Sequence, residues 1–136
     1  MSFLLAARAA FVLLVIVVTY LIVAPNPEGA ETGLDMTRWI ALKLFGDPEL
    51  GDKVGHFLAF CSLGASASLA RIRIAGSGAA TIAALALYGG ALEIVQLLGG
   101  VRDAQFFDAV ADGLGALAGY PAMAWFVAAL RLKARA

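Results

Sequence analysis

Residues 79–98 read AATIAALALYGGALEIVQLL, and this stretch decides the fold class. A membrane-spanning helix needs about 20 predominantly apolar residues, and this run has that length, with Glu93 and Gln96 as its strongly polar side chains. Three further apolar runs of similar length occupy residues 9–24, 54–70 and 104–130. The sequence therefore predicts an all-α fold, an integral membrane bundle of four transmembrane helices.

The composition of the chain agrees with a membrane protein. The 136 residues are 62% hydrophobic and 15% charged, with a mean hydropathy of +0.88, and this length indicates a single domain over residues 1–136. The one cysteine, Cys61, forms no internal disulfide. Zinc-type Cys/His pairs, a Gly-rich phosphate loop and a basic patch are absent from the sequence. We therefore expect no nucleic-acid partner and no cofactor.

We expect the first apolar run to be an uncleaved anchor rather than a signal peptide, because proline occupies position 25 and Ile22 is not a small residue. It leads into an outer loop at residues 25–53. Within that loop, residues 35–45 contain Trp39 and other apolar side chains interleaved with Arg38 and Lys43. This pattern predicts a short amphipathic helix at the membrane interface. This pattern fits either a surface helix that covers the helix bundle or a lid over a binding site.

Basic residues at the helix ends set the expected orientation. With both termini in the cytoplasm, the inner segments hold six basic residues and no acidic residue. The outer side then holds the other four basic residues and all ten acidic ones. We therefore predict a multi-pass protein of the bacterial inner membrane whose N- and C-termini are cytoplasmic. The inner basic residues are Arg8, Arg71, Arg73, Arg131, Lys133 and Arg135.

Ionisable residues within spanning helices are costly, so each is a candidate functional residue. Glu93 and Gln96 are three residues apart, and Asp108 and Asp112 are four apart, so each pair shares one helix face. At 1.5 Å per residue, His56, Glu93 and Asp108 lie about 4–8 Å below the outer boundary. The sequence predicts one polar pocket from three helices, with the binding residues Lys53, His56, Glu93, Gln96, Arg102, Asp108 and Asp112.

Glycines share the helix faces of these acids. Asp108, Asp112, Gly115 and Gly119 follow i, i+4, i+7 and i+11 spacing, and Gly115-x-x-x-Gly119 permits close approach of another helix. The acids should therefore point into the bundle. A purely architectural interpretation, in which basic residues neutralise the acids and fasten three helix ends, stays open. Asp112 argues against it, because the spacing offers no partner for this carboxylate. A metal site using His56 and several carboxylates is chemically possible, but the single histidine argues against it, and we expect none.

The order and spacing of these residues match a known family of membrane proteins. The chain resembles the VanZ-like membrane proteins, named after a glycopeptide (teicoplanin) resistance protein. The matching elements run from Asp52-Lys53-Val54-Gly55-His56-Phe57 through Glu93-x-x-Gln96 and Arg102 to Asp108, Gly113 and Gly115. The family usually has asparagine at the position of Asp112, and a Pro-Gly pair where this chain has Gly100-Val101. The resemblance implies a cell-envelope role at the outer face of a bacterial inner membrane and no settled biochemical activity.

Three functional readings follow from these residues. In the first, an outer-leaflet pocket binds a lipid headgroup or envelope precursor, with Arg102 and Lys53 holding phosphate or carboxylate. In the second, a membrane-embedded enzyme uses His56 as general acid/base, with Glu93 or Asp108 as its carboxylate partner. The candidate catalytic residues are then His56, Glu93 and Asp108. In the third, the chain is a structural accessory subunit that docks into a larger membrane complex through its glycine faces.

Overall fold

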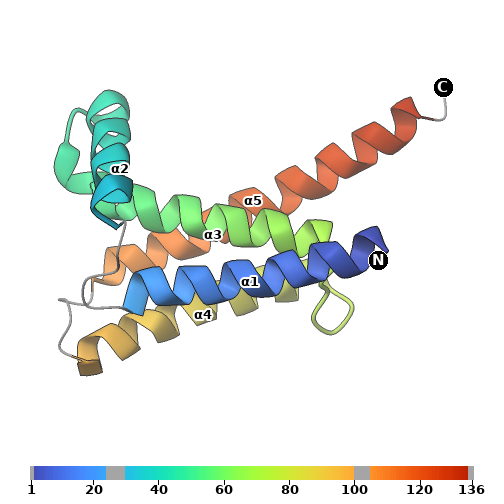
Figure 1. Ribbon diagram of the computed structural model, residues 1–136, viewed down its shortest axis with the longest axis horizontal. Helices are drawn as coiled ribbons and strands as arrows, with labels where there is room; N and C mark the ends of the chain where they lie inside the picture. The colour runs from blue at the N-terminus through green and yellow to red at the C-terminus, as the bar shows by residue number, and fades with distance from the viewer. Residues whose placement is uncertain (1, 24–29, 100–104, 135–136) are drawn as a thin grey trace.

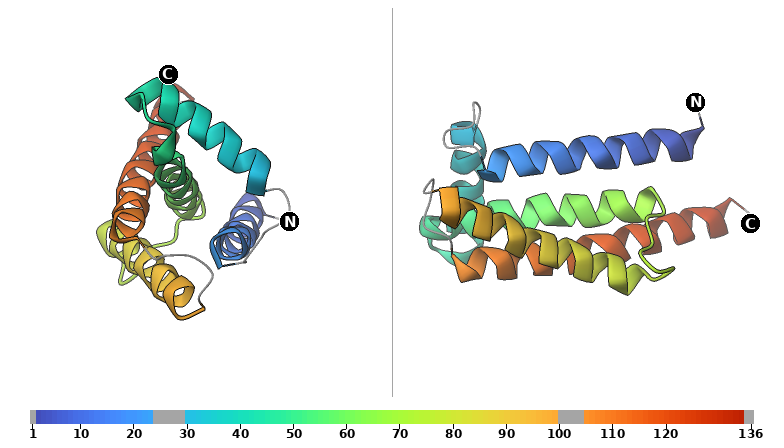
Figure 2. Two further views of the ribbon diagram at one scale, coloured as in Figure 1. Left: turned by 90° about the vertical axis from the view of Figure 1, so that its left-hand side faces the viewer. Right: turned by 90° about the horizontal axis from the view of Figure 1, so that it is seen from below.

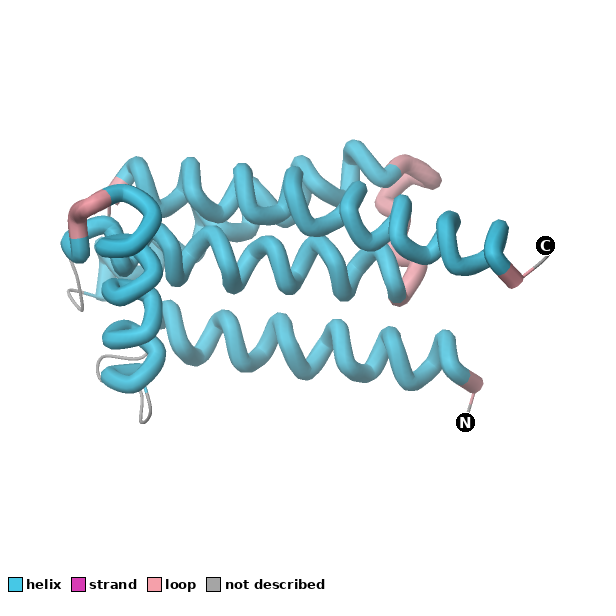
Figure 3. Tube along the Cα trace, turned by 90° about the horizontal axis from the view of Figure 1, so that it is seen from above, coloured by secondary structure: helices cyan, strands magenta, loops and turns pink. Residues whose placement is uncertain are grey.

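The computed structural model describes residues 2–23, 30–99 and 105–134. Four helices lie side by side along the long axis, and one shorter helix crosses their end (Figure 1). We call the crossed end the α2 end. In chain order the elements are α1 (Phe3–Val23), α2 (Ala30–Phe45), the 3-10 turn η1 (Pro48–Leu50), α3 (Gly51–Leu69), α4 (Gly78–Gly99) and α5 (Phe106–Lys133). The all-α prediction is confirmed for the described ranges, which contain helices and loops but no strand (Figure 3).

Three helices, α1, α4 and α5, are long and apolar enough to cross a membrane, with hydropathies of 2.5, 1.7 and 1.4. Their large apolar side chains are widely exposed, including Leu13 on α1, Leu87 on α4 and Trp125 on α5. Such surface needs lipid rather than water around it, so the chain is a membrane protein. The fourth predicted span, α3, does not meet this standard, because its 19 residues include Asp52, Lys53, several serines and several glycines.

The helices are longer than the apolar runs that predict them. The first run starts at residue 9 whereas α1 begins at Phe3, and the last run stops at residue 130 whereas α5 continues to Lys133. Alanine, arginine and lysine are strong helix formers, so helical hydrogen bonding continues beyond the apolar segment. The amphipathic helix predicted at residues 35–45 likewise begins earlier, at Ala30. The ends of the predicted runs at residues 24 and 104 lie outside the described residues.

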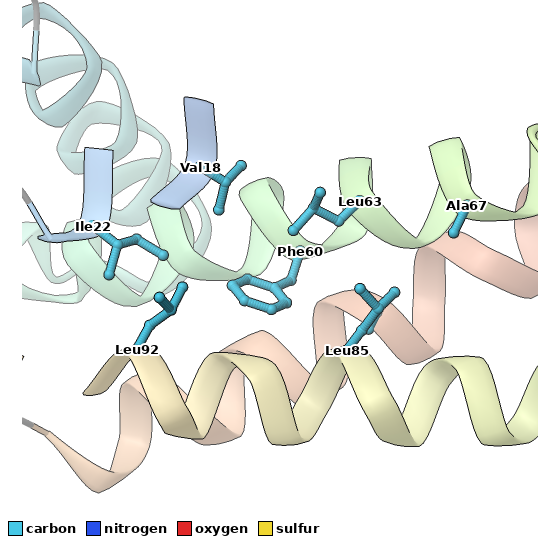
Figure 4. Close-up of a cluster of buried hydrophobic side chains, with 8 residues drawn as sticks. Val18, Ile22, Phe60, Leu63, Ala67, Leu85 and Leu92 are labelled. Carbon is cyan, nitrogen blue, oxygen red and sulfur yellow. The ribbon is translucent and has the colours of Figure 1, made fainter. Parts of the chain in front are cut away.

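A buried apolar cluster forms where α3 lies between the other helices (Figure 4). Phe60 of α3 is completely buried and stands at its centre, with its ring tilted against Tyr88 at a centroid distance of 6.1 Å. α3 therefore occupies the middle of the bundle, against α1, α4 and α5. The other members of the cluster are Val18, Ile22, Leu63, Ala67, Leu85, Leu92 and Ala116.

α3 and α5 pack backbone against backbone along what we call the glycine seam, formed by Gly64, Gly115 and Gly119. A Cβ atom on Gly119 would collide with the carbonyl oxygen of Cys61, and one on Gly115 with that of Phe57. A Cβ on Gly64 would lie 2.7 Å from a backbone oxygen of α5. These contacts leave no room for side chains, which explains the small-residue spacing on both helices.

A tight turn joins α3 to α4 at the end opposite α2 (Figure 3). Arg71, Ala75 and Gly76 adopt left-handed backbone angles there, with φ of 54°, 49° and 73°. The hydroxyl of Thr81 accepts a hydrogen bond from the Ile74 N–H at 3.0 Å, which holds the turn against the start of α4. The start of α1 and the end of α5 also lie at this opposite end (Figure 2).

Candidate functional site

Three helix ends meet beneath α2 and bring their polar residues together. α3 and α5 begin at the α2 end and α4 finishes there (Figure 2). This connectivity places the first turns of α3 and α5 beside the last turns of α4. Four side chains from these turns are buried, with exposed fractions of 6%, 6%, 4% and 0%. We call these four residues the polar layer: His56, Glu93, Asp108 and Asp112.

His56 lies between two carboxylates that come from different helices. Its Nδ1 is 3.0 Å from Asp112 Oδ1 and 3.8 Å from Glu93 Oε1. The shorter distance is that of a hydrogen bond, and the longer one is an ion-pair distance for a protonated ring. Since α3, α4 and α5 each supply one group, these three side chains form a single buried cluster.

Gly89 makes room for the cluster on α4. A Cβ atom at this position would lie 2.5 Å from Asp112 Oδ2 and 2.6 Å from Asp112 Cβ. The aspartate side chain therefore rests on the bare backbone of α4, one helical turn before Glu93. A larger residue than glycine would displace the carboxylate from His56.

A second polar contact lies nearer the α2 end. Lys53 Nζ is 3.2 Å from Asp108 Oδ1 and donates a hydrogen bond to Gln105 Oε1 at 2.6 Å. The backbone N–H of Gln105 donates to Glu93 Oε2 at 3.2 Å. Lys53 thereby neutralises Asp108, and Gln105 links this ion pair to the cluster around His56.

Two carboxylate oxygens of the cluster lack a hydrogen-bond donor within the described part of the chain. Glu93 Oε1 and Asp112 Oδ2 are buried and make no hydrogen bond there. Asp108 Oδ1 shares this description, although its ion pair with Lys53 supplies a positive charge at 3.2 Å. Buried acceptors without donors cost free energy and call for an explanation. The polar layer is therefore incompletely satisfied by the residues that the structure describes.

The predicted site residues divide into three groups. Lys53, His56, Glu93, Asp108 and Asp112 come together as described above. Gln96 is buried, but its side-chain amide donates to the carbonyl oxygen of Ile22 at 2.6 Å, so it fastens α4 to α1. The predicted contact of Arg102 with Glu93 or Asp108 lies outside the described residues.

The expectation that Asp112 has no partner was wrong. His56 Nδ1 lies 3.0 Å from Asp112 Oδ1, closer than it lies to Glu93. Counting residues along each helix gives similar depths for His56, Glu93 and Asp108, whereas Asp112 follows Asp108 by one further helical turn. A tilt between packed helices shifts such depths, and tilt is not encoded in residue spacing.

Sequence reasoning missed two residues that lie at the site. Gln105 precedes α5 as its N-cap residue, and it contacts Lys53 through its side chain and Glu93 through its backbone. A polar residue immediately before the acidic first turn of a helix was the available signal. Arg38 of α2 lines the polar cavity described next, and its basic side chain within the predicted amphipathic helix was the corresponding signal.

Two cavities adjoin the polar layer beneath α2. An apolar cavity of about 270 Å³ lies between α1, α2 and α3, and His56 and Asp52 are on its wall among mainly apolar side chains. A polar cavity of about 450 Å³ lies beside it, lined by Arg38, Glu49, Lys53 and Gln105. Leu34 and Asp52 border both cavities. A hollow with an apolar part and a charged part is thus present at this end.

Comparison with known proteins identifies the family. The chain matches the VanZ/LLP1 family over residues 11–128, a range that includes every residue of the polar layer. No curated protein and no solved structure matches the chain. The match extends from the first helix into the last and covers most of the sequence. The chain therefore belongs to the VanZ/LLP1 family.

Proposed function

We propose that this protein is a four-span membrane protein of the bacterial cell envelope that binds a phosphate-bearing lipid headgroup at its α2 end. The ligand is a membrane phospholipid or a lipid-linked envelope precursor. The observation that carries the proposal is the pair of adjoining cavities that share Leu34 and Asp52. A lipid has the same two parts, an apolar chain and a charged headgroup.

The charges of the polar cavity suit such a headgroup. Arg38 and Lys53 supply donors for phosphate oxygens, and Arg38 packs its side chain over Gly51, where a Cβ would lie 2.6 Å from Arg38 Cγ. Glu49 and Asp52 also line this cavity. Acidic and basic groups together favour a zwitterionic headgroup whose ammonium accompanies the phosphate. The apolar cavity next to it accommodates the first part of an acyl or prenyl chain.

The membrane topology in this proposal includes α3 as a fourth span and α2 as an interfacial helix. At 1.5 Å per residue the 19 residues of α3 extend about 28 Å, close to the hydrocarbon thickness of about 30 Å. α2 exposes Met36, Trp39, Leu44 and Phe45 while it crosses the bundle end (Figure 1). Both features support an α2 end in the outer leaflet, with the basic end and both termini in the cytoplasm.

Binding to the purified protein tests the proposal. Phosphatidylethanolamine should be retained in native mass spectrometry, and Arg38→Gln should weaken it about 10-fold, the loss of one charge-assisted contact. Lys43→Gln is the matched control, because Lys43 is an exposed basic residue in the last turn of the same helix. A polyprenyl phosphate titrated in parallel separates a precursor site from a phospholipid site. Equal lipid affinity for wild type and Arg38→Gln would contradict the proposal.

One observation favours the enzyme reading as a second candidate. The 3.0 Å pair of His56 and Asp112 resembles an acid/base histidine oriented by a carboxylate, and His56 lines the apolar cavity. In that function Asp112 takes the orienting role expected of Glu93 or Asp108. Incubation with the retained lipid, followed by mass spectrometry, separates the two functions. Product formation by wild type that His56→Gln abolishes, with lipid binding kept, identifies an enzyme.

A further inference from the structure

We propose that His56, Glu93 and Asp112 bind a divalent first-row transition-metal ion of the Zn²⁺ or Mn²⁺ type. The site adjoins the apolar cavity through His56 and is distinct from the contacts of Arg38 in the polar cavity, which carry the proposed lipid binding. The single histidine led to the expectation of no metal. The structure brings two carboxylates, from α4 and α5, close to one imidazole nitrogen.

The donor atoms are spaced as they are around a metal ion. One nitrogen of His56 and one carboxylate oxygen each of Glu93 and Asp112 lie within 4.8 Å of one another. Two of these separations are 3.0 Å and 3.8 Å, both measured from His56 Nδ1. Metal–ligand bonds of about 2.0–2.2 Å place neighbouring donors roughly 3.0–3.6 Å apart. A cation therefore fits between these atoms with small side-chain rotations.

Unpartnered buried oxygens point to the same place. Glu93 Oε1, which is 3.8 Å from His56 Nδ1, makes no hydrogen bond within the described residues. Asp112 Oδ2, the second oxygen of the carboxylate that contacts His56, is equally without a donor there. Asp112 is completely buried and Glu93 is 6% exposed. Leaving such acceptors empty is costly in a low-dielectric interior. A bound cation would satisfy both carboxylates at once.

The described groups of the cluster do not balance in charge. Two carboxylates face one imidazole, so even a protonated His56 leaves one net negative charge in the cluster. Lys53 cannot supply the difference, because it is engaged with Asp108 and Gln105. A divalent ion on neutral His56 neutralises the cluster completely. The metal ion replaces the proton that His56 Nδ1 and Asp112 Oδ1 otherwise share.

The ligand types select the class of metal. Magnesium and calcium prefer all-oxygen sites, whereas an imidazole nitrogen favours zinc, iron and related ions. One nitrogen with two carboxylates is a typical mixed set for Zn²⁺ or Mn²⁺. The wall of the apolar cavity includes His56, which gives the cluster a side open to the cavity. The second candidate group, Asp52, His56 and Asp108, is less suited, since Asp108 is already neutralised by Lys53.

Metal content of the purified protein tests the site. The chain is prepared in detergent without a polyhistidine tag, exposed to Zn²⁺ or Mn²⁺, and freed of loosely bound ions on a desalting column. Wild type should retain about one ion per chain. Asp112→Asn and Glu93→Gln should each weaken binding more than about 100-fold, since even the supporting partners of metal ligands are worth about 10–100-fold.

The control is Asp35→Asn, which removes an exposed carboxylate from α2 and should keep the metal. A second measurement needs no variant: Co²⁺ added to wild type should produce visible absorption bands that excess Zn²⁺ removes. Lipid retention is measured on the same samples, so loss of metal with lipid kept separates this inference from the proposed function. Wild type without retained metal and without a Co²⁺ spectrum would overturn the proposal. Unchanged metal content in both ligand variants would do the same.

Discussion

The glycine seam and the polar layer join the same pair of helices, α3 and α5, in opposite ways. In the seam, Gly115 and Gly119 bring the two backbones into direct contact, and no further atom fits between them. In the polar layer, a few residues closer to α2, buried carboxylate oxygens remain without donors in the described residues. The difference supports our proposal that the layer is arranged for a ligand, whereas the seam holds the two helices together.

The largest effect is expected in the seam. Gly119→Ala places a Cβ against the Cys61 carbonyl oxygen and should force α3 and α5 apart, at a cost of at least about 3 kcal/mol. Gly90→Ala is the matched control, because a Cβ there meets no atom within 4 Å. Removing a helical glycine should stabilise that variant by about 0.4–1 kcal/mol. Thermal unfolding in detergent measures both effects. Equal melting temperatures for the two variants would contradict the stabilising role of the glycine seam.

An intermediate effect is expected at the ion pair between Lys53 and Asp108, the residue of the polar layer that has a lysine partner. Lys53→Met leaves Asp108 buried without its cation and should cost about 1–3 kcal/mol, less than a fully buried pair because the lysine side chain is 25% exposed. Asp108→Asn in the same protein should recover most of that loss, since no charge is then left unpaired. Failure of the second substitution to restore the melting temperature would show that Lys53 does not act through Asp108.

A smaller effect is expected at an ordinary, fully paired polar contact outside the layer. The hydroxyl groups of Thr19 and Tyr88 share a hydrogen bond between α1 and α4. Tyr88→Phe should therefore cost about 0.5–1.5 kcal/mol. Tyr20→Phe removes a more exposed hydroxyl from α1 and should change the melting temperature little. Identical behaviour of the two variants would remove this contact from the forces that hold α1 to the bundle.

Much of this architecture could be predicted from the sequence. Hydropathy identified the apolar helices, and i, i+4 spacing placed Asp108, Asp112 and the seam glycines on one face of α5. The helix ends that meet at the α2 end followed from connectivity alone. These features depend on local periodicity and chain order, which a sequence displays directly.

The remainder depended on contacts that leave no local signal. The pairing of His56 with Asp112 follows from the rotation and tilt of two helices, which spacing does not specify. Gln96 binds the carbonyl oxygen of Ile22, and Gln105 reaches Glu93 through its backbone N–H. Backbone carbonyl and N–H groups are common to nearly all residue types, so the identity of a residue does not predict which of them forms such a contact.

The central claim is that the polar layer is arranged for a ligand rather than for fastening helices, and Glu93→Gln tests it most directly. Glutamine keeps an acceptor for the Gln105 N–H and removes only the buried charge beside His56. The measurement is the melting temperature of this variant and of wild type, both treated with a chelator. The account predicts a melting temperature equal to wild type or higher, because an incompletely satisfied buried charge has been removed. A fall of about 5 °C or more, corresponding to roughly 1 kcal/mol or more, would contradict it and make the layer a fastener.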